Sequence, residues 1–368
     1  MSSMGVNTSS QLGIIIVTYQ SERHIGPLLG SLAATIDRAR TTIWVFDNAS
    51  TDATITAFEH ENQALGLGAR LVKSESNLGF ARANNEVFAL MRAEMPCDIV
   101  MLLNPDTVVQ EGWWQPLLAA LDNPSVGTAV PLLLMPDGTI NARGDALHFL
   151  GIGFVQGFGE TVPPSPMTDA GLFFASGAAL AFRTATLDAM NARFGLSGIF
   201  WEDLFLYAED TDLGWRMRLA GFDNRLVATS HVTHDYRFWT QSEDVSSDRL
   251  FWIERNRYLL LFSNFKWPTL ILLFPWILGS EIALSLGVWK LYPHRLRLWR
   301  EVVKQLKSPL FWSRRHRLQS GRTARDRDIL RTMTGSIRHG ARSFGLMDRL
   351  LDLALRGSHL LLCTIVWW

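Results

Sequence analysis

The sequence predicts an α/β protein with a mostly parallel central sheet, and two observations support this class. Over the first hundred residues, short apolar runs alternate with segments whose apolar residues have helical spacing. The fourth such run, at 99–103, is wholly apolar, as expected of a strand that is buried on both faces. Alternation of this kind favours right-handed crossovers between parallel strands.

The expected elements follow in order along the chain. Strands are predicted at 13–17, 42–46, 70–73 and 99–103, and helices at 27–36, 53–58 and 80–91. Ser50 or Thr51 is expected to cap the second helix, because a hydroxyl oxygen can accept a hydrogen bond from the free N–H groups there. Later helices are predicted at 113–121 and 184–191, extended segments at 126–134 and 226–233, and a surface segment rich in Gly and Pro at 151–166.

Polar side chains follow the predicted strands where each strand ends. The carboxyl ends of parallel strands lie along one edge of a sheet, where open α/β sheets bind ligands. The side chains expected to gather there are Tyr19, Asp47, Asn77 with Arg82, and the run Asn104-Pro105-Asp106. Taken alone, this run can also be interpreted as a simple turn, since all three residue types favour turns. The chain has neither a Gly-x-Gly-x-x-Gly motif after the first strand nor a P-loop, which argues against a dinucleotide-binding fold and a P-loop NTPase.

A cluster of acidic side chains precedes a predicted helix that ends near Gly221. Glu209, Asp210 and Asp212 would lie at the N-terminus of this helix, where negative charge is favourable. For Asp212 we favour this capping role. For Glu209 and Asp210 a general-base role competes, because adjacent carboxylates disfavour double ionisation and can raise one pKa.

Two histidines, His231 and His234, lie near the end of the predicted strand at 226–233. A lone histidine is usually structural, but imidazole is also a common metal ligand. The carboxylate-bearing loops described above strengthen the interpretation of one histidine as a metal ligand.

Six short motifs, in order within residues 12–257, resemble glycosyltransferase family 2, and within it the rhamnosyltransferase-like branch. They are Val-Thr-Tyr at 17–19, Asp-Asn-Ala-Ser-Thr-Asp at 47–52, Asn-Leu-Gly-Phe-Ala-Arg-Ala-Asn-Asn at 77–85, Leu-Asn-Pro-Asp at 103–106, Ser-Gly-Ala at 176–178 and Tyr-Ala-Glu-Asp-Thr-Asp-Leu-Gly-Trp-Arg at 207–216. The resemblance implies a GT-A-type, Rossmann-like α/β sandwich and an inverting mechanism.

The same resemblance implies how the donor is bound. Tyr19 and Asp47 would contact the nucleotide base, with Asn77 and Arg82 nearby. The family's donors are nucleotide-diphosphate sugars, and dTDP-rhamnose is the candidate for this branch.

The resemblance also implies a metal site and a base. Asp106 matches the last residue of the family's Asp-x-Asp motif and would hold Mg or Mn on the donor diphosphate, while Asn104 stands at the motif's first position. His234 is implied as the histidine that completes the metal site, with His231 as the second choice. Asp210 matches the base that deprotonates the acceptor hydroxyl, and Glu209 is the less favoured candidate.

The C-terminal third is expected to form a helical region that associates with a membrane. The strongest apolar run, at 267–291, is interrupted by Pro275 and Glu281, so an interfacial or re-entrant helix competes with a spanning one, and a buried hairpin is the third alternative. Residues 290–342 contain 15 Lys and Arg against 3 acidic residues, which suits anionic lipid head groups. No motif for nucleic-acid recognition accompanies these charges. We therefore expect a GT-A domain at 1–260 and a membrane-associated region at 261–368.

Composition bears on the compartment. Cys97 and Cys363 lie far apart in a chain of 368 residues, so the sequence indicates no disulfide framework. Residues 1–11 are polar, and nothing in them suggests export. We expect the protein at the cytoplasmic face of the inner (plasma) membrane, as a peripheral or monotopic protein.

The function expected from the sequence is metal-dependent, inverting transfer of a sugar, with rhamnose as the candidate, to a lipid-linked glycan acceptor in cell-surface polysaccharide synthesis. The alternative is a nucleotide-sugar or glycan binding subunit with a degenerate site, because Asn104-Pro105-Asp106 carries a single carboxylate. The sequence leaves the acceptor linkage and the oligomeric state open.

Overall fold

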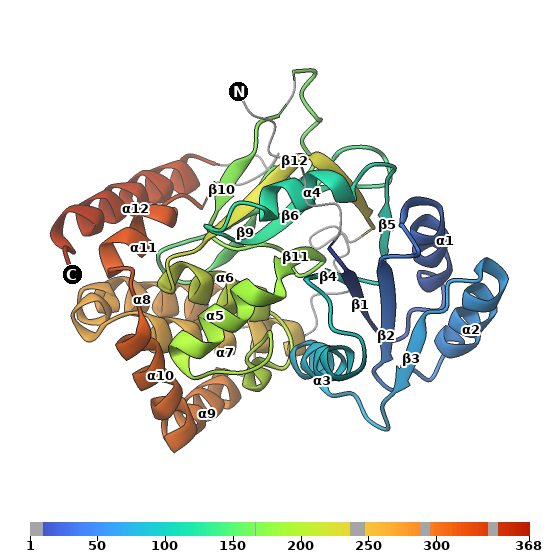
Figure 1. Cartoon of the computed structure of the whole chain (residues 1–368). Helices are drawn as coiled ribbons and strands as arrows, with labels where there is room; N and C mark the ends of the chain where they lie inside the picture. Colours follow the sequence, from blue (N-terminus) through green and yellow to red (C-terminus); the bar gives the residue numbers. More distant parts are fainter. Residues whose placement is uncertain (1–9, 166, 236–246, 288–294, 338–344) are drawn as a thin grey trace.

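A computed structural model of the chain describes residues 10–165, 167–235, 247–287, 295–337 and 345–368. Figure 1 shows a central sheet with helices packed against it and a further group of helices from the C-terminal third at one end of the molecule. The expected α/β class is confirmed.

The central sheet combines a parallel half with a mixed half. Its strands are β1 (Leu12–Thr18), β2 (Thr41–Asp47), β3 (Arg70–Lys73), β4 (Ile99–Leu103), β5 (Thr107–Val109), β6 (Val126–Leu134), β7 (Ile140–Ala142), β10 (Ala170–Leu172), β11 (Ala179–Arg183) and β12 (Asp223–His234). The order is β10-β12-β6-β11-β4-β1-β2-β3, with β5 beside β12 and β7 beside β6. The pairs β1–β2, β1–β4, β2–β3 and β6–β12 are parallel, whereas β11 runs antiparallel to β4 and β6.

The predicted helices are present, with bounds that differ by a few residues. The helices are α1 (Ile25–Thr35), α2 (Thr54–Leu65), α3 (Gly79–Glu94), α4 (Trp114–Leu121), α5 (Thr184–Phe194), the short 3-10 helix η1 (Glu202–Leu204), α6 (Glu209–Leu219), α7 (Ser247–Asn264), α8 (Trp267–Gly287), α9 (Arg295–Leu306), α10 (Pro309–Gly321), α11 (Asp326–Thr332) and α12 (Leu346–Ile365). Within the described residues, no helix combines the length and the hydropathy needed to cross a bilayer.

The inner parallel strands β1 and β4 are buried on both faces because helices cover each side of the sheet. Along β4, Val100 and Leu102 pack in one apolar cluster, which also contains Phe88 of α3. The alternate residues, such as Met101, pack in a second cluster with Leu28 of α1. This arrangement explains why the run at 99–103 has no polar face.

Two local expectations were wrong. Ser50 and Thr51 do not cap α2, because their hydroxyl oxygens accept hydrogen bonds from Gln20 instead. The segment at 151–166 is not merely a surface excursion. It contributes β9 (Gly153–Val155), which forms an antiparallel hairpin with β8 (Asp145–Leu147).

The expected capping role of Asp212 was also wrong. Its carboxylate is 0% exposed and accepts hydrogen bonds from Arg216 Nε at 2.7 Å and from Arg314 Nη2 at 2.5 Å. Burial opposes ionisation of Asp212, but the two guanidinium groups outweigh it and hold its pKa below the ordinary value. Arg314 belongs to α10, so the C-terminal helices fix the position of α6.

We expect Arg314→Met to destabilise the protein, because Asp212 would lose one of its two buried cationic partners. Removing one partner of a buried ion pair costs about 3–5 kcal/mol, and the retained Arg216 places this variant near about 3 kcal/mol in the free energy of unfolding. Urea unfolding followed by circular dichroism measures this value. His316→Ala, an exposed change on the same helix, is the control and should stay within about 0.5 kcal/mol of the wild type. Equal losses in both variants would show that Asp212 does not depend on Arg314.

Candidate active site

A cleft of about 310 Å³ opens at the carboxyl ends of β1, β2 and β4, where ligands bind in open α/β sheets. Its lining comes from the predicted strand ends and from the loop that precedes α6. The lining residues are Val17, Tyr19, Gln20, Ser21, His24, Asn48, Asn77, Gly79, Phe80, Asn104, Pro105, Asp106, Phe205 and Leu206.

Four of the six predicted donor-binding residues line this cleft, namely Tyr19, Asn77, Asn104 and Asp106. Tyr19 is 51% exposed, so its ring is available to stack on a planar group. Asn77 is held by a 3.0 Å hydrogen bond that Asn48 Nδ2 donates to its side-chain oxygen.

The other two, Asp47 and Arg82, are not among the lining residues. Asp47 is 1% exposed, and its carboxylate accepts hydrogen bonds from the Thr18 hydroxyl at 3.0 Å and from the Ser50 backbone N–H at 2.9 Å. In this structure it shapes the loop after β2. Arg82 donates to Glu86 one turn further along α3, and both side chains are exposed.

Asp106, which lines the cleft, lies next to the buried His234. β12 pairs with β5 there, and His234 Nε2 lies 3.4 Å from Asp106 Oδ1. A contact with Asn141 Oδ1 at 3.2 Å orients the imidazole through Nδ1. Burial alone would raise the pKa of Asp106, but the hydrogen bond and the charge of His234 outweigh it and lower that pKa.

These two side chains suit a divalent cation. Asp106 Oδ1 and His234 Nε2 lie 3.4 Å apart, so an oxygen and a nitrogen that can each bind a metal lie side by side. Among the described residues, no group of three or more His, Cys, Asp or Glu side chains could hold a metal.

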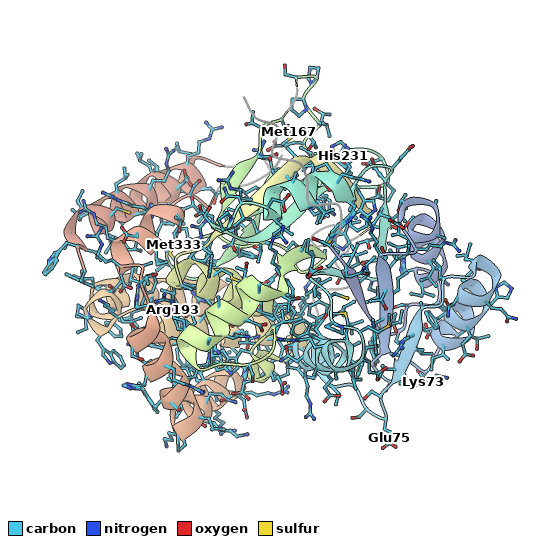
Figure 2. All side chains as sticks on the ribbon, in the orientation of Figure 1. Lys73, Glu75, Met167, Arg193, His231 and Met333 are labelled. Atoms are coloured by element: carbon cyan, nitrogen blue, oxygen red, sulfur yellow. The ribbon has the colours of Figure 1, made fainter. Side chains whose placement is uncertain are left out.

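The second-choice histidine lies elsewhere. His231, labelled in Figure 2, is on the same strand as His234 but an odd number of residues away, so the two side chains point to opposite faces. His231 Nε2 contacts the backbone oxygen of Ala228 at 3.1 Å. The structure therefore brings His234, and not His231, to Asp106.

The loop that leads into α6 has a strained backbone. Phe205, Tyr207 and Ala208 all have φ values between 61° and 66°, which side chains larger than glycine rarely adopt. Asn256 of α7 stabilises this conformation, because its Nδ2 donates to the backbone oxygens of Leu204, Leu206 and Tyr207 at 2.7–3.0 Å. The sequence analysis missed Asn256, and only its position on a helix that follows the loop by about fifty residues could have suggested it.

Gly79 allows this loop to close over the donor side of the cleft. It has φ 79°, and a Cβ atom there would lie 2.5 Å from the backbone oxygen of Phe205. Only glycine avoids both the unfavourable backbone conformation and this clash. Phe205 consequently reaches the cleft beside Phe80.

Asp210 lies at the start of α6, where backbone N–H groups donate hydrogen bonds to its carboxylate. Its carboxylate accepts hydrogen bonds from the backbone N–H groups of Gly177 at 3.1 Å and Thr211 at 2.6 Å. Burial raises its pKa above the ordinary value, although these hydrogen bonds oppose the shift. A carboxylate with a raised pKa that remains hydrogen-bonded in its ionised form suits a general base.

Glu209 differs from its neighbour. It is buried, and burial followed by the negative charge of Asp210 raises its pKa well above the ordinary value. Glu209 Oε2 is buried without a hydrogen-bond partner, whereas the Asp210 carboxylate accepts two backbone hydrogen bonds, so the geometry favours Asp210 as the base.

The base lies next to the donor cleft. A Cβ atom on Gly177 would lie 3.5 Å from Phe80 Cε1 and 3.7 Å from Asp210 Cβ. Gly177 therefore lies between Asp210 and Phe80, which lines the cleft, and is close to both. The arrangement places a carboxylate–histidine pair and a separate carboxylate base around one cleft.

Comparison with known proteins finds relatives in sequence and in fold. Residues 13–188 match the family model described as "Glycosyl transferase family 2". N-acetylglucosaminyl-diphospho-decaprenol L-rhamnosyltransferase of Mycobacterium tuberculosis is 29% identical over 244 residues, which cover 61% of this chain and 75% of that protein.

Solved structures show the same fold at low sequence identity. GalNAc-T7 with UDP, GalNAc and Mn²⁺ aligns with a TM-score of 0.55 and 14% identity, covering 71% of this chain and 49% of that one, so this chain spans about half its length. A mannosyltransferase of Pyrobaculum calidifontis with GDP-Man and Mn²⁺ aligns with a TM-score of 0.50 and 16% identity over 86% of this chain and 87% of that one. S. aureus TarS with UDP-GlcNAc gives the same score and identity over 97% and 90%.

The sequence matches and the shared fold agree with the resemblance found in the six motifs. They identify residues 13–188 as a glycosyl transferase family 2 domain that is similar to a rhamnosyltransferase, and they show that the fold is GT-A-like.

Proposed function

We propose that this chain is a metal-dependent, inverting glycosyltransferase that transfers rhamnose from dTDP-rhamnose to a lipid-linked glycan acceptor. The observation that carries the proposal is the placement of Asp210 next to a cleft that is lined by Asp106, whose carboxylate contacts His234. The name of the Mycobacterium tuberculosis relative supports the sugar and the lipid-linked class of acceptor.

In this proposal, different residues act on the attacking group and on the leaving group of a single displacement reaction. Asp210 takes the proton of the acceptor hydroxyl as that oxygen attacks the anomeric carbon of the donor sugar, and the bond from that carbon to the diphosphate oxygen breaks. Attack from the side opposite the leaving group inverts the configuration. Asp106 and His234 would hold Mg or Mn, which supplies positive charge to the departing diphosphate. Two of the solved structures with this fold contain Mn²⁺ together with a nucleotide or nucleotide sugar.

We also propose that the C-terminal helices attach the enzyme to the cytoplasmic face of the inner membrane as a peripheral protein. α12 presents an apolar stripe to solvent, with Leu350 and Leu353 53% and 66% exposed, while Asp352 is buried. Exposed apolar residues on α8, including Ile271 and Phe274, add to this surface. Trp368 Nε1 donates to Thr269 Oγ1 at 2.9 Å and so links the end of α12 to the start of α8. Such exposed apolar surface suits an acyl-chain boundary better than water.

Asp210→Asn should lower the rate of transfer by about 100- to 10,000-fold, because the amide cannot accept the proton. Binding of dTDP-rhamnose, measured by thermal shift in the presence of Mn²⁺, should persist. Glu209→Gln is the matched variant, and it should retain far more activity because Glu209 takes no proton in this scheme. The opposite ranking of the two variants would assign the base to Glu209.

The pH dependence of transfer should report the raised pKa of Asp210. Since the base must be ionised, activity is lost as the pH falls through its pKa, and a raised pKa moves this loss to a higher pH than for an ordinary aspartate. A profile of kcat/KM between pH 4 and 9 at about 25 °C measures this acid limb. Full activity down to about pH 4 would contradict a buried base.

Removal of divalent cations should abolish transfer, and Mn²⁺ or Mg²⁺ should restore it. Asp106→Ala should remain inactive with added metal, because it removes the carboxylate that would hold the cation. The variant should unfold at nearly the wild-type temperature without ligand but lose the metal-dependent stabilisation by dTDP-rhamnose. Undiminished transfer in excess EDTA would refute metal dependence, and ligand binding without any turnover would support a binding subunit.

The membrane proposal predicts that the full chain co-sediments with vesicles of phosphatidylglycerol and phosphatidylcholine. Leu350→Gln combined with Leu353→Gln should weaken this partitioning at least about tenfold, since each buried leucine contributes about 1.5–3 kcal/mol. Leu90→Gln, at a partly exposed leucine of α3, is the control and should bind as the wild type does. Vesicle binding that is unchanged in the double variant would exclude this stripe as the attachment surface.

A further inference from the structure

A second cavity, of about 510 Å³, lies between α7, α8 and α9, and the reaction scheme above does not use it. Its lining is mainly aliphatic and aromatic, and within the described residues it has one charged member, Glu281. The carboxylate of Glu281 accepts hydrogen bonds from the hydroxyl group of Tyr258 and from Arg257 Nη2. Because these partners already hold the charge, the cavity suits an apolar ligand rather than a cation.

This cavity opens onto the exposed surface of α8. Phe274, Leu278 and Ile282 follow one another at intervals of four residues, so they lie on one face of the helix. All three line the cavity, yet they are 60%, 47% and 53% exposed. An apolar chain that entered the cavity would therefore cover side chains that are otherwise in contact with water.

The active-site loop contacts the start of α7 through a cation. The guanidinium carbon of Arg249, the third residue of α7, lies 5.6 Å from the centre of the Tyr207 ring. Tyr207 is three residues before the base, Asp210. Guanidinium groups bind phosphate oxygens strongly, and the N-terminus of a helix also favours negative charge. The start of α7 therefore suits an anionic group that lies next to the base.

A second cation connects this turn of α7 with the cavity. Arg297 of α9 lies 3.3 Å from Asp248, and both side chains are exposed. Such an exposed pair is weak, so Arg297 can exchange Asp248 for a more highly charged anion. Two residues further along α9, the ring of Trp299 packs against Tyr258 in the wall of the cavity, with centroids 4.8 Å apart. Positive charge thus extends from the active-site loop to the edge of the cavity.

This order of groups matches the chemistry of a lipid-linked sugar. The base would meet the sugar, the two arginines would meet the diphosphate, and the cavity would meet the apolar chain. An acyl chain of a membrane phospholipid would also suit an apolar cavity, but it would give no reason for the connection with the active-site loop.

We propose that the cavity between α7, α8 and α9 binds the isoprenoid units of the acceptor that lie next to its diphosphate. This inference rests on the proposed function and adds a subsite for the lipid part of the acceptor. The cavity takes no part in the covalent step. By holding the chain, it keeps the acceptor sugar close to Asp210.

The test combines Leu278→Gln with Ile282→Gln in the full chain and uses dTDP-rhamnose, Mn²⁺ and a non-ionic detergent. Two acceptors are compared, N-acetylglucosaminyl diphosphates that carry either a farnesyl or a methyl group. The wild type should favour the farnesyl acceptor in kcat/KM by at least about tenfold, the effect of burying about two methylene groups. The variant should lose most of this preference, because its amide groups lie where the chain would bind. Its kcat/KM for the methyl acceptor should stay within about threefold of the wild type.

Ile271→Gln combined with Leu353→Gln is the matched control, since both residues are exposed and lie outside the cavity lining. This control should keep the preference for the farnesyl acceptor. A wild type that uses both acceptors equally well would overturn the proposal, as would equal losses for both acceptors in the cavity variant. A cavity variant that keeps the preference but binds vesicles more weakly would assign the cavity to a membrane lipid and would also overturn it.

Binding measured without transfer separates this inference from the proposed function. In isothermal titration calorimetry, farnesyl diphosphate should bind the wild type at least about tenfold more tightly than methyl diphosphate does, and the cavity variant should lose this difference. Transfer without any preference for farnesyl would leave the proposed function in place and reject the cavity. Preferential binding of farnesyl diphosphate to a wild type that transfers no sugar would reject the proposed function and retain the cavity as an isoprenoid site.

Discussion

The buried carboxylate of Asp212 is the interaction on which the catalytic half of the structure depends. It lies between two guanidinium groups, one from its own helix and one from α10, and no water reaches it. Without one of these guanidinium partners, the buried negative charge of Asp212 would be strongly unfavourable. The helix that presents Asp210 can therefore adopt its position only when the C-terminal helices are packed against it. The apolar cluster on this face accordingly contains side chains from both parts of the chain, such as Phe194 and Phe311.

The carboxyl groups of the site differ in their pKa values because their surroundings differ. The contact with His234 lowers the pKa of Asp106, and the ionised carboxylate is the form that binds a cation. Burial without a cation instead raises the pKa values of Asp210 and Glu209. Backbone N–H groups from Gly177 and Thr211 then select Asp210 as the one that ionises first. Carboxyl groups of the same kind thus acquire separate roles through environment alone.

Local sequence patterns were sufficient for the four parallel strands of the first hundred residues and for the residues that directly follow them. The apolar run at 99–103 predicted β4, and the polar residues that follow it predicted a cleft lined by Asp106. Both predictions depend only on residues that are neighbours in the sequence. The role of Asp212 depends on Arg314, which is 102 positions away, and that of the loop before α6 depends on Asn256. Contacts between residues so far apart in the sequence leave no local pattern from which they could be predicted.

α7 connects the active-site loop to the proposed membrane-facing helices. Asn256 holds the strained loop that carries Phe205 into the cleft, while the next two residues, Arg257 and Tyr258, bind Glu281 of α8. The outer side of α8 carries the exposed Ile271 and Phe274. Because α7 makes buried polar contacts both with the active-site loop and with α8, it moves little relative to either of them. A lipid-linked acceptor would therefore meet a base whose position relative to the lipid surface is fixed by packing, which reduces the entropy that must be lost before attack.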